Sequence, residues 1–272
     1  MDKTPIRYGC WPSAWTAAKA AAASRDYAEL RAGHGGLFWI EYRPEDARSR
    51  LWFRRDGAPR CLTPPGFSVC SRVYEYGGGA FCLTAPGLAF VNEADQQVYR
   101  QALADSEGAS APPLALTARP SCRYGDLHYA AAWRALLAVE EEHAVDGVRH
   151  RLVSLSWPEG RRRVIAAGAD FYAAPSLSPD GRRLAWIEWD RPAQPWTATR
   201  LCLAQVDGAG QLGEPSILAG KDGRESLQQP RFAADGRLYC LSDRHGWWQP
   251  WVEAQGRLRP VGRAARTGQA TE

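Results

Sequence analysis

The sequence Ala-Pro-Ser-Leu-Ser-Pro-Asp-Gly-Arg-Arg-Leu-Ala-Trp-Ile-Glu-Trp-Asp spans residues 174–190, and Arg-Leu-Cys-Leu-Ala-Gln-Val-Asp follows at 200–207. Ser178-Pro179-Asp180-Gly181 predicts a turn, because proline presets φ, aspartate bonds to nearby backbone, and glycine accepts a positive φ. Beyond the turn, alternate side chains are apolar on both faces of residues 184–189. This alternation predicts three consecutive strands, with a central strand that is buried on both faces.

The same unit recurs at residues 229–243, where Asp235-Gly236-Arg237 matches Asp180-Gly181-Arg182. Comparable strand patterns recur along the chain about 50 residues apart, which is a typical spacing for the blades of a β-propeller. We therefore predict an all-β fold, a β-propeller with about five four-stranded blades. The expected blades span residues 33–57, 76–104, 122–160, 171–208 and 229–260.

The ends of the chain have a different character. Residues 1–32 are expected to form an N-terminal extension, with a short helix within Thr16–Ala32 that Thr16 caps, because this stretch is rich in alanine. Residues 261–272 are small and polar, without a strand pattern, and are expected to be disordered. Five blades are fewer than a closed array of this kind usually contains.

Composition narrows the classes of function. Among the 272 residues, twelve Trp, 19 Pro and 26 Gly favour short strands joined by turns. A formal net charge of +4 without a long basic run argues against a nucleic-acid partner. Neither a signal peptide nor a long apolar run is evident, and the seven cysteines are scattered. These features predict a cytoplasmic protein without a membrane partner, and without a metal or a cofactor.

Five segments of the sequence are informative when taken together. They are Tyr-Gly-Cys-Trp-Pro-Ser at 8–13, Arg-Val-Tyr-Glu-Tyr-Gly-Gly-Gly at 72–79, Gly-Ala-Asp-Phe-Tyr-Ala-Ala-Pro at 168–175, Leu-Ser-Pro-Asp-Gly-Arg-Arg-Leu-Ala-Trp at 177–186 and Ser-Asp-Arg-His-Gly-Trp-Trp at 242–248. In this order they resemble the propeller of the prolyl oligopeptidase family of serine peptidases, particularly its bacterial dipeptidyl aminopeptidase and acylaminoacyl-peptidase-like branch. The resemblance covers about residues 8–253.

In that family, a propeller of seven or eight blades precedes an α/β-hydrolase domain with the catalytic Ser, Asp and His. This chain contains no Gly-x-Ser-x-Gly nucleophile motif. The resemblance therefore implies the non-catalytic propeller portion of an aminopeptidase-type enzyme that hydrolyses short peptides. It would dock and gate a peptide, and it would be inactive without the hydrolase domain as its partner.

Seven residues are candidates for contact with substrate. Glu140, Glu141 and Glu142 resemble the glutamate pair with which related dipeptidyl peptidases hold a peptide amino group, although the end of a strand entering a polar loop is the plainer interpretation. At most two of the three share a face of a strand. The other candidates are Arg72 and Glu75, beside the Gly77–Gly79 run, and Trp247 and Trp248.

Alternative functions remain open. A stand-alone TolB-like propeller would bind a peptide or protein partner at one end of its channel. A propeller lactonase or phosphatase would need several carboxylate or histidine ligands aimed into the channel, and the sequence shows no such set. Ser242-Asp243-Arg244-His245 contains the letters of a catalytic triad, but neighbours on a hairpin point in different directions, so these residues are expected to brace a blade.

Overall fold

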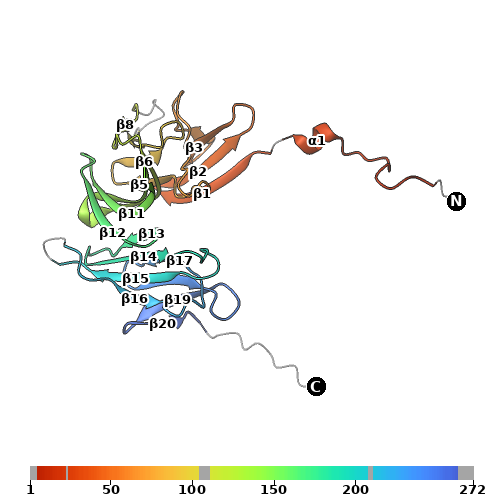
Figure 1. The fold of residues 1–272 in the computed structure, drawn as a ribbon. Coiled ribbons are helices and arrows are strands. Elements are labelled where there is room, and N and C mark those ends of the chain that lie inside the picture. The colour runs from red at the N-terminus through yellow and green to blue at the C-terminus, as the bar shows by residue number, and fades with distance from the viewer. Residues whose placement is uncertain (1–4, 23, 104–110, 208–210, 263–272) are drawn as a thin grey trace, which may run out of the picture.

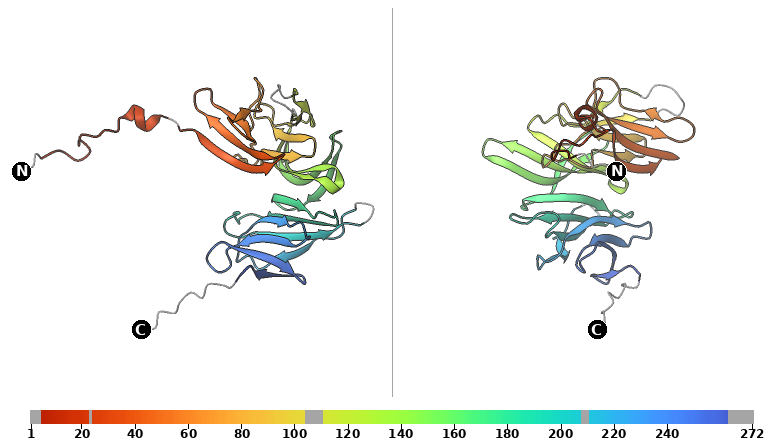
Figure 2. Two further views of the ribbon diagram at one scale, coloured as in Figure 1. Left: turned by 180° about the vertical axis from the view of Figure 1, so that it is seen from behind. Right: turned by 90° about the vertical axis from the view of Figure 1, so that its right-hand side faces the viewer.

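Five four-stranded antiparallel sheets make up the protein in the computed structural model (Figure 1). The structure describes residues 5–22, 24–103, 111–207 and 211–262. In every sheet the strands pair in the order in which they occur along the chain, so each sheet is a simple meander. The sheets follow one another in chain order, from orange β1–β3 to blue β19 and β20 (Figure 2).

The predicted all-β propeller with five four-stranded blades is therefore confirmed. The first two sheets contain β1 (Asp26–Gly33), β2 (Gly36–Arg43), β3 (Arg48–Arg54) and β4 (Arg60–Cys61), then β5 (Phe81–Thr84), β6 (Gly87–Val91), β7 (Val98–Ala102) and β8 (Leu114–Ala115). The third contains β9 (Cys122–Ala130), β10 (Ala135–Ala144), β11 (Gly147–Ser156) and β12 (Arg162–Ala167). The last two contain β13 (Phe171–Leu177), β14 (Arg183–Trp189), β15 (Arg200–Gln205) and β16 (Ser216–Ala219), then β17 (Leu227–Phe232), β18 (Leu238–Ser242), β19 (Gln249–Ala254) and β20 (Arg257–Pro260).

Buried apolar side chains fill the space between each pair of neighbouring sheets. Phe38 and Leu51 of the first sheet pack with Phe81 and Phe90 of the second, and equivalent clusters join each later pair. The packing of β14 explains why its sequence is apolar on both faces, because each face contacts a different neighbouring sheet. Trp186 packs toward the third sheet, whereas Ile187, the next residue, packs toward the fifth.

The N-terminal helix is shorter than the alanine-rich sequence suggests. Helix α1 spans only Ala17–Ala21, and the Thr16 hydroxyl accepts a hydrogen bond from the Lys19 amide at 3.1 Å, as expected of its cap. Residues 26–32, expected to lie in the extension, instead belong to β1 (Asp26–Gly33), which pairs with β2. Helix propensity is a weak preference, and here the pairing with β2 overrides it. The N-terminal segment extends away from the sheets (Figures 1 and 2).

The observed sheets also extend beyond the expected blade ranges at both edges. The first strand of the first sheet and the short outer strands lie outside those ranges, because they carry little apolar alternation; β4 and β8 are two residues each. The segment 263–272, part of the expected tail, lies outside the described residues. Within the described part of the chain, no helix is long and apolar enough to cross a membrane.

Candidate functional site

The loop Arg72–Gly79 enters the propeller just before β5 and lies against the inner strand β9. The carbonyl groups of Gly78 and Gly79 accept hydrogen bonds from the amides of Asp126 and Leu127, at 3.1 and 2.9 Å. A Cβ atom on Gly79 would lie 2.4 Å from the Cα atom of Asp126. The run of glycines therefore permits the close backbone approach that its sequence indicated.

Tyr74 fixes this loop to two further blades. Its backbone amide donates to the Glu141 carboxylate at 2.7 Å. Its hydroxyl donates to the Tyr172 carbonyl at 2.8 Å and accepts from the Tyr172 amide at 2.9 Å. Burial raises the pKa of Tyr74, so the hydroxyl stays protonated and can fill both roles. The loop is thereby held between β10 of the third sheet and β13 of the fourth.

Glu141 is the centre of a polar cluster at the end of β10. Its Oε1 atom lies 2.7 Å from Nε2 of His143 and 3.3 Å from the Arg123 guanidinium, and Oε2 lies 3.2 Å from Nε2 of His150. Burial acts to raise the pKa of Glu141, but the hydrogen bonds together outweigh it and lower the pKa to about 2. Glu141 is therefore ionised at neutral pH, and its two oxygens are already well supplied with donors.

Glu75 shares Arg123 with this cluster. Its Oε1 atom accepts from Nη1 of Arg123 at 2.6 Å, while its side chain remains 76% exposed. Glu75 and Glu141 both line a cavity of about 350 Å³ with the two histidines. Of all the candidate residues, these two carboxylates are the pair that the structure brings together in a cavity, although they are far apart in the sequence.

Glu140 and Glu142 lie on the opposite face of β10 from Glu141, as strand alternation requires. Glu140 is completely buried, and both of its oxygens accept from Arg162 at 2.6 Å. Glu142 pairs with Arg151 at 2.7 Å and with Arg119 at 3.1 Å. The two carboxylates are thus paired with arginines on the other face of the third sheet, away from the cavity that Glu75 and Glu141 line.

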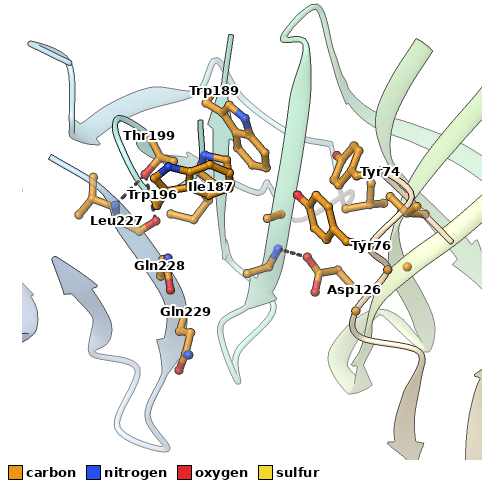
Figure 3. Close-up of a pocket in the computed structure, with 18 residues that line it drawn as sticks. Tyr74, Tyr76, Asp126, Ile187, Trp189, Trp196, Thr199, Leu227, Gln228 and Gln229 are labelled. Atoms are coloured by element: carbon orange, nitrogen blue, oxygen red, sulfur yellow. Dashed lines mark hydrogen bonds between the residues drawn. The ribbon is translucent and has the colours of Figure 1, made fainter. Parts of the chain in front are cut away.

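A second, mostly apolar cavity of about 360 Å³ adjoins the polar one (Figure 3). The two share Tyr74, Tyr76, Trp189 and Pro195. In Figure 3, Tyr74 and Tyr76 approach from one side, and Ile187, Trp196 and Leu227 lie on the other. Tyr76 and Trp196 are 68% and 64% exposed, so two aromatic rings are open to an incoming molecule.

The sequence identified only part of this site. Trp196 was not selected, because it lies in the irregular segment between β14 and β15, and Trp189 was assigned only to a buried face. Tyr76 lies within one of the five quoted segments, so its place in the chain was noted but its role was not. Tyr76 and Trp196 could have been identified by looking for aromatic residues in the loops at the end of the blades where Glu141 lies.

The remaining candidates lie apart from both cavities. The Arg72 guanidinium pairs with Glu93 at 3.0 Å on the surface. Trp247 and Trp248 lie in the loop between β18 and β19, and Trp247 is 73% exposed. This loop joins the second and third strands of its blade, as the segment carrying Trp196 does, so the meander order places both at the same end of the strands.

The Ser242–His245 segment braces its blade, as expected. The Asp243 carboxylate accepts from the Ser226 amide at 2.7 Å, and the Arg244 guanidinium binds Glu225 at 2.9 and 3.0 Å. The Ser242 hydroxyl donates to Glu225 at 2.6 Å. Its proton is therefore directed to a structural carboxylate. Among the described residues, no group of three or more His, Cys, Asp or Glu side chains is arranged to hold a metal ion.

No protein-family model matches the sequence, and no curated protein matches it. Solved structures do. A puromycin-hydrolysing peptidase of Mycobacterium tuberculosis is 30% identical with a TM-score of 0.80, over 96% of this chain and 42% of its own. The S511A variant of a puromycin hydrolase, in complex with PGG, is 29% identical with a TM-score of 0.81, over 95% of this chain and 42% of its own.

A structure from a study of two prolyl endopeptidases shares the fold at 13% identity, with a TM-score of 0.56 over 87% of this chain and 35% of its own. This chain thus spans about two fifths of the length of the puromycin-hydrolysing proteins. The match covers its five blades and agrees with the five sequence segments quoted above. The chain therefore belongs to the prolyl oligopeptidase family of serine peptidases, of which it represents the β-propeller portion.

Proposed function

We propose that this propeller docks and gates the substrate of a peptidase of the aminopeptidase type, and that it does not itself perform the hydrolysis. The observation that carries the proposal is the adjacency of two cavities with different chemistry. One is lined by Glu75 and Glu141, and the other by Tyr74, Tyr76 and Trp196. A short peptide with a free amino group and a large apolar first side chain has the complementary chemistry.

Charge favours a cation in the polar cavity. Glu141 is ionised, and the exposed Glu75 carboxylate has one oxygen in contact with Arg123. An ammonium group would find acceptors in Glu75 and the outer lone pairs of Glu141. Since Glu141 already receives three hydrogen bonds, Glu75 is the better candidate for direct contact.

The similar proteins support an aminoacyl substrate. Two of them are described as hydrolysing puromycin, a compound with a free α-amino group beside an aromatic side chain. Hydrolysis itself would need the α/β-hydrolase domain that the family carries. As part of this proposal we place the protein in the cytoplasm, because four of its cysteines are buried free thiols.

The test is binding of Phe-Gly-Gly-amide to the purified chain, compared with the same peptide acetylated at its amino end. The free amine should bind about tenfold more tightly or better, and Glu75→Gln should remove most of that difference. Glu45→Gln, which changes an exposed carboxylate in the first sheet, is the matched control. Trp196→Ala should weaken Phe-Gly-Gly-amide more than Ala-Gly-Gly-amide, because it removes one wall of the apolar cavity.

Equal binding of the free and acetylated peptides would contradict the docking proposal. Release of product by the purified chain, blocked by a serine-directed inhibitor, would contradict its non-catalytic part. A stand-alone binding propeller would instead be indicated by tight binding of a folded protein partner, with no preference for a free amine.

A further inference from the structure

A β-bulge recurs in the inner strands of the propeller. The pairing register shifts between Ala28 and Arg31 in β1, and the same kind of shift occurs in β9, β13 and β17. Each shift contains a residue with positive φ, and in the second blade such a residue lies two positions before the first residue of β5. These residues are Glu29, Gly79, Asp126, Ala174 and Gln229, with φ of 54°, 58°, 49°, 51° and 51°.

The bulge defines equivalent positions around the channel. Two residues after each left-handed residue stand Arg31, Phe81, His128, Ser176 and Arg231. Three of these side chains, Arg31, His128 and Arg231, line one cavity of about 260 Å³. Two arginines from the first and fifth blades thus meet a histidine of the third, which no stretch of sequence places together. This cavity touches the apolar one at Asp126 and Ala174.

The two arginines differ from Arg162 and Arg244, whose side chains are also partly buried. Arg162 and Arg244 each bind a carboxylate at hydrogen-bond distance. In the part of the chain that the structure describes, no carboxylate lies within 4.0 Å of Arg31 or Arg231. Nη1 of Arg231 donates to the carbonyl of its neighbour Pro230 at 2.8 Å, and the Arg31 guanidinium lies 5.8 Å from the centre of the Phe81 ring.

Two acidic groups stand near the pair, and both are held by the backbone. The Asp126 carboxylate accepts from the Ala174 amide at 2.9 Å, and the Glu29 carboxylate accepts from the Ala80 amide at 2.9 Å. Burial raises the pKa of each. Neither carboxylate therefore forms a contact ion pair that would satisfy the guanidinium groups.

The two positive charges also affect the pKa values of the groups around them. Burial, followed by the charges of Arg231 and Arg31, lowers the pKa of His128 to about 4. Partial burial and then the Arg31 charge lower the pKa of Arg231 as well, although part of its side chain remains exposed to solvent. At neutral pH, His128 is therefore an uncharged imidazole between two cations.

We propose that Arg31, His128 and Arg231 form a binding site for a small oxyanion, a carboxylate or phosphate group, in the central channel. Each guanidinium presents a fork of N–H donors that matches such a group, and the neutral imidazole supplies one further N–H. An anion would also relieve the repulsion between the two arginines. This site is separate from the amine-binding cavity, and it stands whether or not the proposed function is correct.

The test uses the full chain and two probes, inorganic phosphate and acetyl-Gly-Gly-Gly with a free carboxylate. The amide of the same blocked peptide is the control ligand, and the blocked amino end keeps the amine-binding cavity out of the measurement. Binding is followed through the His128 ring resonances. Saturation should raise the pKa of His128 above about 4, since an adjacent anion stabilises the imidazolium.

Arg31→Gln and Arg231→Gln should each weaken binding by about tenfold or more, because each removes a charged hydrogen-bond donor. Each should also raise the pKa of His128 without any ligand. Arg257→Gln, on the exposed edge strand β20, is the matched control and should change neither quantity. If a glutamine variant fails to fold, Arg31→Lys and Arg231→Lys retain the charge but lose the fork, and should still weaken binding.

The two probes separate the sources of the anion. Saturation by phosphate alone would indicate a free anion, and saturation by the peptide carboxylate but not by its amide would indicate the end of a peptide. Either result supports the site. Saturation by neither probe, or equal binding by the wild type and the arginine variants, would overturn it.

Discussion

The Tyr74 hydroxyl and the backbone of Tyr172 exchange two hydrogen bonds, one in each direction, at 2.8 and 2.9 Å. Tyr74 lies in the loop before the second blade, and Tyr172 lies in the inner strand of the fourth. One side chain thus satisfies the amide and carbonyl of a strand two blades away. The same tyrosine ring lines both cavities of the candidate site, so the fold and the site depend on a common residue.

Tyr74→Phe should destabilise the protein without changing its fold. The substitution removes the hydroxyl and leaves the amide and carbonyl of Tyr172 without that partner, which costs about 1 to 3 kcal/mol. Urea unfolding monitored by circular dichroism measures the change in the free energy of unfolding. Tyr27→Phe, at an exposed position of β1, should change it by less than about 0.5 kcal/mol. Equal effects of the two substitutions would show that the bridge contributes nothing.

Glu141 should make the protein acid-sensitive over a defined range. Its pKa is about 2 in the folded state and 4.5 for the free group, so the ionised carboxylate favours the folded state. This contribution, on the order of 2 to 3 kcal/mol, is complete above about pH 4.5 and is lost as the pH falls toward 2. Glu141→Gln should therefore be less stable than wild type at pH 7, and the difference should shrink through that range.

The measurement is chemical denaturation of the wild type and Glu141→Gln at pH 7, 5 and 3. Other carboxylates with lowered pKa, including those of Glu142 and Asp190, titrate in both proteins and so cancel in the comparison. A difference in stability that stays constant from pH 7 to 3 would show that the ionisation of Glu141 is not coupled to folding.

The fold was largely predictable because turns and apolar alternation are local signals. The Asp-Gly-Arg turns and the doubly apolar strand at residues 184–189 determine where a blade lies, and both are confirmed. The strand β1 was missed because its side chains are mostly exposed and carry no apolar face. Because β1 has no apolar face, the helix predicted from the alanine-rich segment before it was extended into residues that form this strand.

The site was less predictable because it depends on contacts between blades. The sequence marked Glu140, Glu141 and Glu142 as one group, and alternation correctly implied that they face two ways. Nothing local showed that Glu141 would meet Glu75 through Arg123, or that Arg162 would bind Glu140. Arg162 is the middle residue of three consecutive arginines, and only the structure shows that its guanidinium binds the buried Glu140 carboxylate.

Arg162 should be far more important for stability than its neighbour in the sequence. Its guanidinium binds both oxygens of the buried Glu140 carboxylate, so Arg162→Met would leave a buried charge without its closest partner. A loss of about 3 to 5 kcal/mol is expected. Arg161→Met, at an exposed position, is the matched control and should be nearly neutral. The double variant Glu140→Leu with Arg162→Met should recover much of the loss, because neither charge remains; a double variant as unstable as Arg162→Met alone would contradict this account.

Gly79→Ala should separate steric crowding from backbone conformation. Gly79 has φ of 58°, and an added Cβ atom would lie 2.4 Å from the Cα atom of Asp126. Gly256, with φ of 72° in the turn before β20, has no atom within 4 Å of such a Cβ. Gly256→Ala should therefore cost only the left-handed conformation, about 1 kcal/mol.

Gly79→Ala should cost at least about 2 kcal/mol more than Gly256→Ala, because the loop must move away from β9 or distort it. Such a shift would carry Tyr74 and Glu75 with it, so binding of Phe-Gly-Gly-amide should weaken in the same variant. Urea unfolding measures the first effect, and calorimetric titration of the folded protein measures the second. Equal costs for the two substitutions would mean that the glycines are required for their φ values alone, and that the contact between the loop and β9 does not position the site.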